Sequence, residues 1–478
     1  MPLIKDIDCN ISPQCRILLI LKTRTTLGKI DMESQSDHVK SNNFNNPSKI
    51  INLQTRYNAV EQREREGPEE QPPHVAAELA DEISLVGRNL HPDGNRRDVS
   101  QAHRQTPPLD ERLNATNDLE RRRARTLAIL SQEFRDVTVS RSNIETSVSR
   151  LYRENQTLPR FSLHVNFNGE EGEDFDGLTS EMFTLFWESV YRSYFTGIRR
   201  LSPRISPTHD LSADTWQIIG RILSHGYVLS NFLPTQITYS TMYYLFTGNE
   251  PTTREYVSSF LNTLSERNET FLNRAMRSNP AVPRFQEPFQ TNLVAILSHY
   301  GATALPSPRS INTIISQIAR YQLHLQPFYA LYNIRTGMLR SHDSIWNPRP
   351  SNYSIFHIFN LFHPTPDNVI DHFDVEYSNV PLQRAIEERI VEWITRFIFT
   401  LTIPQLMILL RFITSSNIVN GQIRITFDGN VDPHSPIRVA TCGRQLIISR
   451  NILSYEAIED FLLNVINNPD VWNSFDII

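Results

Sequence analysis

The spacing of apolar residues along the chain predicts both strands and helices. Apolar residues take every second position over 161–167 (FSLHVNF) and 423–427 (IRITF), which is the period of a strand with one buried face. Over 178–190 and through much of 211–345, apolar residues recur instead at the spacing of a helix with one buried face. The pattern predicts an α+β fold whose middle is mostly helical.

Prolines and capping residues predict where several elements end. Pro364 and Pro366 stand close together in FHPTPDNVID, where they stop a helix and stiffen the chain, so we place a domain boundary there. Pro381 and Pro404 suit the first turns of two later helices. A last helix begins after the capping residue Ser454 and stops at NNP. Its predicted buried face consists of Ile458, Phe461, Leu462, Val465 and Ile466.

The first part of the chain has a different composition. Residues from about 30 to 110 are rich in Asn, Ser, Pro, Gln and charge and poor in aromatic residues, so they cannot bury enough apolar surface to offset chain entropy. We interpret 1–110 as a disordered arm. A helical pattern follows in ERLNATNDLERRRARTLAIL, and we interpret its arginine cluster as the solvated face of an amphipathic helix in preference to a binding patch.

Length and charge exclude several classes of protein. The 478 residues exceed what one core usually supports, so we expect two or more folded units. With 47 Lys and Arg against 52 Asp and Glu, the net charge is −5, and without a long basic run we expect no nucleic-acid partner. The longest early apolar run, ILLIL, is too short for a membrane helix or a signal-peptide core. We therefore expect no membrane association and a place in the cytosol or the nucleus.

Most motifs that carry chemistry are missing from the sequence. It contains no phosphate-binding loop, no HExxH, no GxSxG and no paired CxxC. The acidic turn GEEGEDFDG lacks the ligand spacing of an EF-hand, so we interpret it as a structural turn. Cys9, Cys15 and Cys442 are too few and too scattered for a disulfide framework or a zinc site.

One cysteine has surroundings that suit a nucleophile. Cys442 stands between the predicted strands RVAT and QLIIS, next to Gly443, which would allow close approach. The nearby cationic side chains, which would stabilise a thiolate, are Arg438, Arg444 and His434. An inert, buried cysteine remains the alternative, since free cysteine often behaves as a small apolar residue.

The segment around Cys442 resembles part of a known family. The segment VATCGRQLIISRNILSYEAIEDFLLNVI resembles the C-terminal lobe of HECT-type ubiquitin ligases, in which a Thr-Cys pair precedes a short apolar strand and a last amphipathic helix. Four more segments resemble the family's motifs in the family's order: VTVSRSNIETSV, LHVNFNGEEGEDFDGLTSEMFTLFW, WQIIGRILSHGYVL and LMILLRFITSS. The departures are Asp176 in place of the first of two paired glycines, Ser415 in place of a glycine, Gly443 in place of an aromatic residue and a missing Leu-Pro pair before the cysteine loop.

The resemblance implies a bilobal HECT-like fold. The arm, 1–110, and a helical lead-in, 111–134, would precede a mostly helical N-lobe over 135–363. A hinge at 364–368 would connect it to a smaller, mixed α/β C-lobe over 369–478.

The resemblance also implies the activity. Cys442, preceded by Thr441, would accept ubiquitin as a thioester from a charged ubiquitin-conjugating enzyme and pass it to a lysine of a protein substrate, with no metal or organic cofactor. Phe475, fourth from the end, takes the place of the family's tail anchor, and Asp476 or the terminal carboxylate would orient or deprotonate the incoming amine.

Three alternatives stay open. The chain would bind ubiquitin as a weak or inactive HECT-like scaffold if the departures abolish turnover. A cysteine hydrolase would need a histidine base such as His434, but no papain-like or caspase-like signature surrounds it. Phe475 and Trp472 would merely cover the C-lobe if the tail packs locally.

Overall fold

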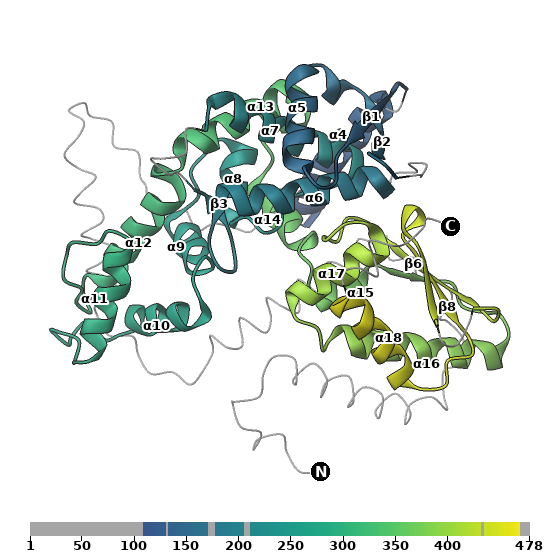
Figure 1. Ribbon diagram of the computed structural model, residues 1–478. Coiled ribbons are helices and arrows are strands. Elements are labelled where there is room, and N and C mark those ends of the chain that lie inside the picture. Colours follow the sequence, from purple (N-terminus) through teal and green to yellow (C-terminus); the bar gives the residue numbers. More distant parts are fainter. Residues whose placement is uncertain (1–108, 131, 171–176, 205–210, 432–434, 469–478) are drawn as a thin grey trace, which may run out of the picture. The chain divides into compact units, whose positions relative to one another are not determined.

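The computed structural model describes residues 109–130, 132–170, 177–204, 211–431 and 435–468 (Figure 1). Residues Ala115–Ile478 form one compact unit, which is the subject below. The fold is α+β, predominantly helical with small sheets, as the sequence predicts. Almost all of the predicted arm lies outside the described residues.

Helices make up most of the part of the chain that the structure describes, with short strands between them. The elements up to residue 361 are α4 (Leu109–Leu130), β1 (Phe134–Val139), α5 (Ile144–Glu154), η2 (Leu158–Arg160), β2 (Ser162–Phe167), α6 (Gly177–Tyr194), β3 (Phe195–Thr196), β4 (Ser202–Pro203), α7 (Ala213–Ser230), α8 (Tyr239–Thr247), α9 (Thr253–Leu261), α10 (Glu266–Met276), α11 (Phe289–His299), α12 (Ile311–Arg320), the π-helical turn η3 (Tyr321–Leu325), α13 (Phe328–Trp346) and α14 (Asn352–Leu361). The later elements are α15 (Pro366–Asp371), β5 (Phe373–Val375), α16 (Pro381–Ile398), α17 (Ile403–Thr414), β6 (Ile423–Asp428), β7 (Ile437–Ala440), η4 (Thr441–Gly443), β8 (Gln445–Ser449) and α18 (Tyr455–Asn467).

Buried apolar side chains gather in three groups. The large core contains residues between 119 and 362 together with Ile418, the small core lies within 256–323, and the C-terminal core lies within 369–466. The small core belongs to α9–α12 and the turn η3, which are inserted between helices of the large core. Each core gathers its apolar faces because removing them from water is favourable.

The predicted strand over 161–167 is confirmed as β2. Leu163, Val165 and Phe167 are buried, as the alternation requires. β2 pairs in parallel with β1, and Val165 lies opposite Val137. A parallel pair needs a crossover, which α5 provides.

The arginine cluster of α4 is solvated only in part: Arg121 and Arg125 are exposed, whereas Arg122 and Arg123 are half-buried. Arg122 donates through Nη1 to the carbonyl oxygen of Ile345 at 3.1 Å, and Arg123 donates to that of Val228 at 3.1 Å. These guanidinium groups satisfy backbone carbonyls near the ends of α7 and α13. The cluster therefore attaches α4 to the large core.

Two glycines let α7 and α13 approach closely at the centre of the large core. A Cβ atom at Gly220 would lie 1.9 Å from the carbonyl oxygen of Ile334. A Cβ atom at Gly337 would lie 2.0 Å from that of Gln217. Backbone meets backbone here, so any side chain at either position would separate the two helices. Gly220 is the glycine of the GR pair in WQIIGRILSHGYVL.

A buried histidine connects α5, α7 and the start of β2. The Nδ1 atom of His225 lies 2.6 Å from the hydroxyl of Tyr152, and its Nε2 lies 2.9 Å from the carbonyl oxygen of Phe161. Since a carbonyl only accepts, Nε2 carries the proton and Nδ1 accepts from the tyrosine. Burial, with a smaller contribution from nearby His342, lowers the pKa of His225 to about 3.

A second buried histidine lies at a kink in α13. His342 has non-helical backbone angles, and its Nε2 lies 2.8 Å from the carbonyl oxygen of Pro159. Its Nδ1 lies 2.9 Å from the hydroxyl of Ser224, which accepts from Nε1 of Trp346 at 2.8 Å. Burial lowers the pKa of His342 to about 4. Both imidazoles are therefore neutral parts of the large core.

The C-terminal core combines a sheet with three long helices. The strand order is β5-β6-β8-β7, parallel except for the antiparallel pair β8–β7. The predicted strand 423–427 is confirmed as β6, and α16 and α17 begin with their predicted prolines in the first turn. The predicted last helix is α18, whose N-cap Ser454 accepts from the backbone N–H of Ala457. Of its predicted buried face, Ile458, Leu462, Val465 and Ile466 are buried and Phe461 is half-buried.

The segment with the two prolines carries the chain from one core to another. Phe362 is buried in the large core and Val369 in the C-terminal core. Pro366 takes the first turn of α15, where Thr365 caps the helix by accepting from the backbone N–H of Asn368. The change of core falls at the predicted boundary, while motion about 364–368 stays a prediction.

One departure from the family pattern has a backbone consequence. Ser415 ends α17 with φ 57° and ψ 9°, in the left-handed region, and its N–H donates to the carbonyl oxygen of Arg411 at 2.9 Å. Glycine adopts this conformation without a Cβ penalty, which explains physically why a glycine suits the position.

We expect Ser415→Gly to raise the free energy of unfolding by about 0.5–1 kcal/mol, since left-handed backbone costs a non-glycine residue about 1 kcal/mol. Chemical denaturation measures the change. The matched control is Ser415→Ala, which removes the same hydroxyl but keeps Cβ and should bring no gain. Equal effects of the two substitutions would contradict the assigned strain.

Candidate active site around Cys442

Cys442 lies in the short turn that joins β7 to β8. Ala440 and Gln445 form the last antiparallel pair before the turn, and η4 begins directly after Ala440. Arg444 closes the turn in the left-handed region at φ 49°, where its N–H donates to the carbonyl oxygen of Thr441 at 3.1 Å. The predicted strand–Cys–strand order is confirmed, and the tight turn presents Cys442 at one end of the sheet.

The neighbouring cationic residues are placed differently from what the sequence suggests. Arg444 donates through Nη1 to the carbonyl oxygen of Asn420 at 3.0 Å, so its guanidinium attaches the loop to the segment after α17. Arg438 is exposed on β7, and His434 lies outside the described residues. A Cβ atom at Gly443 would meet only that of Gln445, at 3.9 Å, so the fold does not require glycine there.

The close approach occurs instead at Gly177, which the sequence analysis did not single out. A Cβ atom at Gly177 would lie 3.0 Å from Sγ of Cys442 and 3.6 Å from its Cα. Gly177 is the first residue of α6, so the half-buried thiol lies at the positive end of a helix dipole. The available signal was the family's paired glycines, of which Asp176 replaces the first and Gly177 retains the second.

A charged network lies one turn farther along α6. Arg141 donates to both carboxylate oxygens of Glu170, at 2.7 and 2.8 Å, and to Glu181 at 2.7 Å. The hydrogen bonds that Arg141 donates lower the pKa of Glu170, and the same bonds to Glu170, with a smaller contribution from those to Glu181, raise the pKa of Arg141. Arg141 is the arginine of the segment VTVSRSNIETSV, so this motif serves to hold two acidic side chains in place.

The remaining predicted site residues are distributed as follows. Thr441 is half-buried beside Cys442, and its carbonyl oxygen closes the turn. Phe475 and Asp476, like most of the acidic turn, lie outside the described residues. The structure thus brings together Cys442, Thr441 and Gly177.

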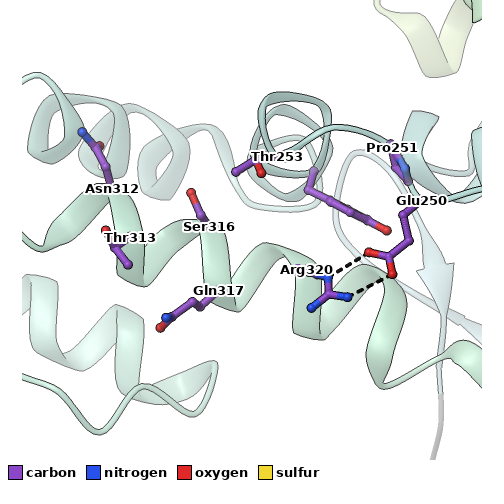
Figure 2. Close-up of a pocket in the computed structure, with 9 residues that line it drawn as sticks. Glu250, Pro251, Thr253, Asn312, Thr313, Ser316, Gln317 and Arg320 are labelled. Carbon is purple, nitrogen blue, oxygen red and sulfur yellow. Dashed lines mark hydrogen bonds and ion pairs between the residues drawn. The ribbon is translucent and has the colours of Figure 1, made fainter. Parts of the chain in front are cut away.

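A separate pocket lies between α9 and α12 (Figure 2). It measures about 420 Å³, and hydroxyl and amide side chains form most of its wall. The guanidinium of Arg320 donates two hydrogen bonds to the carboxylate of Glu250 at its edge, at 2.8 and 2.9 Å. None of the site residues predicted from the sequence lines this pocket. The full lining is Glu250, Pro251, Thr253, Tyr256, Asn312, Thr313, Ser316, Gln317 and Arg320.

Two further searches concern the described residues alone. No cluster of three or more His, Cys, Asp or Glu side chains in this part of the chain could hold a metal ion. None of the helices built from these residues is both long and apolar enough to cross a membrane.

Comparison with known proteins adds no relative. The chain matches no model of a known protein family, and no curated protein matches it either.

Proposed function

We propose that the protein is a HECT-type ubiquitin ligase that carries ubiquitin on Cys442. The observation that supports this most is the position of the thiol, in a tight turn between two strands and against the first residue of α6. A nucleophilic cysteine needs partial exposure, and the half-buried thiol in this turn has it. Five sequence segments resemble the family's motifs in the same order, and this resemblance supports ubiquitin as the donor of the acyl group.

The first step is a transfer between two thiols. The Cys442 thiolate attacks the carbonyl carbon of the thioester between ubiquitin and the conjugating enzyme. A new C–S bond forms, the old one breaks, and the conjugating enzyme leaves as a thiolate. The free-energy change is close to zero because one thioester replaces another.

The second step transfers ubiquitin to the substrate lysine and is irreversible. The lone pair of a substrate lysine attacks the thioester on Cys442, a C–N bond forms, and the Cys442 thiolate leaves. The amine must lose a proton, for which Asp476 is the proposed acceptor. An alcohol in place of the thiol would form a more stable ester with a poorer leaving group, so the chemistry requires cysteine.

The proposal extends to the arrangement of the chain. The large and small cores would make up the N-lobe, the C-terminal core the C-lobe, and 364–368 the hinge. The conjugating enzyme would dock on the N-lobe. A stripe of exposed aromatic and apolar side chains on η3 and α13 supports a protein partner there, since aromatic residues are enriched at protein interfaces. Its members are Tyr321, Leu325, Phe328, Tyr329 and Tyr332.

A single incubation tests the activity. The protein is mixed with ubiquitin, activating enzyme and a panel of charged conjugating enzymes, and the products are separated on a non-reducing gel. We expect an adduct of one ubiquitin that disappears on reduction. Ubiquitin binding without any adduct would favour the inactive-scaffold alternative.

A substitution in the tail should affect the second step and not the first. We expect Phe475→Ala to load ubiquitin normally and to discharge it to lysine about tenfold or more slowly, because loss of the proposed aromatic anchor would remove about 1.4 kcal/mol or more of transition-state stabilisation. Single-turnover chase with free lysine measures the discharge. A matched fall in loading and discharge would show instead that Phe475 only covers the C-lobe.

A further inference from the structure

Polar contacts hold the large core against the C-terminal core near Cys442. Arg411 of α17 donates to the carboxylates of Glu181 and Glu188 on α6, each at 3.4 Å. Asn417, just after α17, donates through Nδ2 to Glu188 at 3.1 Å. Glu188 therefore accepts from two side chains of the opposite core.

The loop of Cys442 is attached to the same contact. Asn420 donates through Nδ2 to the carbonyl oxygen of Ser230 at 3.0 Å, and Asn231 donates to the carbonyl oxygen of Asn420 at 3.2 Å. That carbonyl also accepts from Arg444 of the cysteine loop at 3.0 Å. Movement of Asn420 away from α7 would therefore carry the cysteine loop with it.

Little apolar surface holds this contact together. Among the described residues after Phe362, Ile418 alone belongs to the large core, where it is 1 % exposed. Carboxylate, guanidinium and amide groups regain hydrogen bonds to water when they separate, whereas apolar surface does not. The contact can consequently open at a small cost compared with either core.

We propose that the hydrogen bonds from Arg411 and Asn417 to the carboxylates of α6 can be released and that they determine the exposure of Cys442. We call these contacts the clasp. In the closed arrangement Gly177 covers the half-buried thiol. When Arg411 and Asn417 leave Glu188, the cysteine loop moves off α6 and the thiol becomes accessible to a partner. Glu188 is the positioning residue of the clasp. The clasp regulates the thiol on which the proposed function rests, but its test requires no ubiquitin.

The test compares alkylation rates of Cys442 in the full chain. Iodoacetamide labelling is followed by mass spectrometry of the peptide that contains Cys442, with Cys9 and Cys15 of the same molecules as internal references. The variants are Glu188→Ala, Arg411→Ala and their combination. The control is Glu388→Ala, which removes an exposed ion pair with Arg384 on α16. Denaturation midpoints report whether each variant is folded.

We expect Glu188→Ala and Arg411→Ala each to raise the Cys442 rate about three- to tenfold, the range that a partly buried ion pair provides. The double variant should exceed the larger single effect but fall short of the product of the two, because both substitutions remove the Arg411–Glu188 pair while each also removes one further partner, Glu181 or Asn417. Gly177→Leu, which displaces the loop without touching the clasp, should raise the rate as well. The control and the two reference cysteines should not change.

Unchanged Cys442 rates in folded Glu188→Ala and Arg411→Ala would overturn the clasp. A variant whose Cys442 is alkylated faster but still takes no ubiquitin would instead contradict the proposed ligase activity while leaving the clasp intact. The two failures are therefore distinguishable.

Discussion

We expect Cys442→Ala to form no ubiquitin adduct under conditions in which the unaltered chain is fully loaded. The substitution removes the only group proposed to accept the acyl chain, so the loss should be complete within detection, roughly a thousandfold or more. Cys442→Ser should give either no adduct or an ester that resists reduction, because oxygen replaces sulfur. Non-reducing gels run with and without thiol separate these outcomes.

The other two cysteines provide the matched controls. Cys9→Ser and Cys15→Ser should load at the unaltered rate, since both lie far from the predicted C-lobe along the chain. A thiol-sensitive adduct that persists in Cys442→Ala would show that ubiquitin is carried elsewhere. Loss of cooperative unfolding in Cys442→Ala would void the comparison, so its denaturation midpoint is measured in parallel.

The second large effect concerns pH. In the unfolded chain His225 and His342 titrate at the ordinary pKa of about 6.5. In the folded chain burial lowers the pKa of His225 to about 3 and that of His342 to about 4. Between pH 6.5 and pH 4 the unfolded state therefore binds a proton at each of these two positions that the folded state does not, and His363, whose pKa burial also lowers to about 3, adds a third. Stability is complete above pH 6.5 and falls as the pH falls.

The expected loss is substantial for a domain of ordinary stability. At pH 5 each histidine costs the folded state about 2 kcal/mol, or about 4 kcal/mol for the pair, against a total of about 5–15 kcal/mol. Chemical denaturation at several pH values measures this slope. His342→Gln should remove about 2 kcal/mol of the loss at pH 5, because one of the buried neutral imidazoles is gone. An identical slope in folded His342→Gln would falsify the assignment.

The local elements could be predicted from the sequence. The strand period over 161–167 and 423–427, the prolines that open α16 and α17 and the cap at Ser454 all act within a few residues, and the structure agrees with them. The position of Cys442 between two strands also followed from local alternation. The attachment of Arg122 and Arg123 to the large core was missed because their acceptors lie more than a hundred residues away along the chain.

The sequence predicted the element types and singled out Cys442 as a candidate nucleophile, because both depend on periodicity, backbone stereochemistry and side-chain chemistry. The predicted boundary at Pro364 and Pro366 lies between Phe362 of the large core and Val369 of the C-terminal core. Only the tertiary structure decided which groups meet. It placed Gly177 against Cys442, Glu188 against Arg411 and Ser224 against His342. Each pair joins segments far apart along the chain, and the distances and directions that make a covered thiol, an ion pair or a hydrogen bond exist only once the helices have packed.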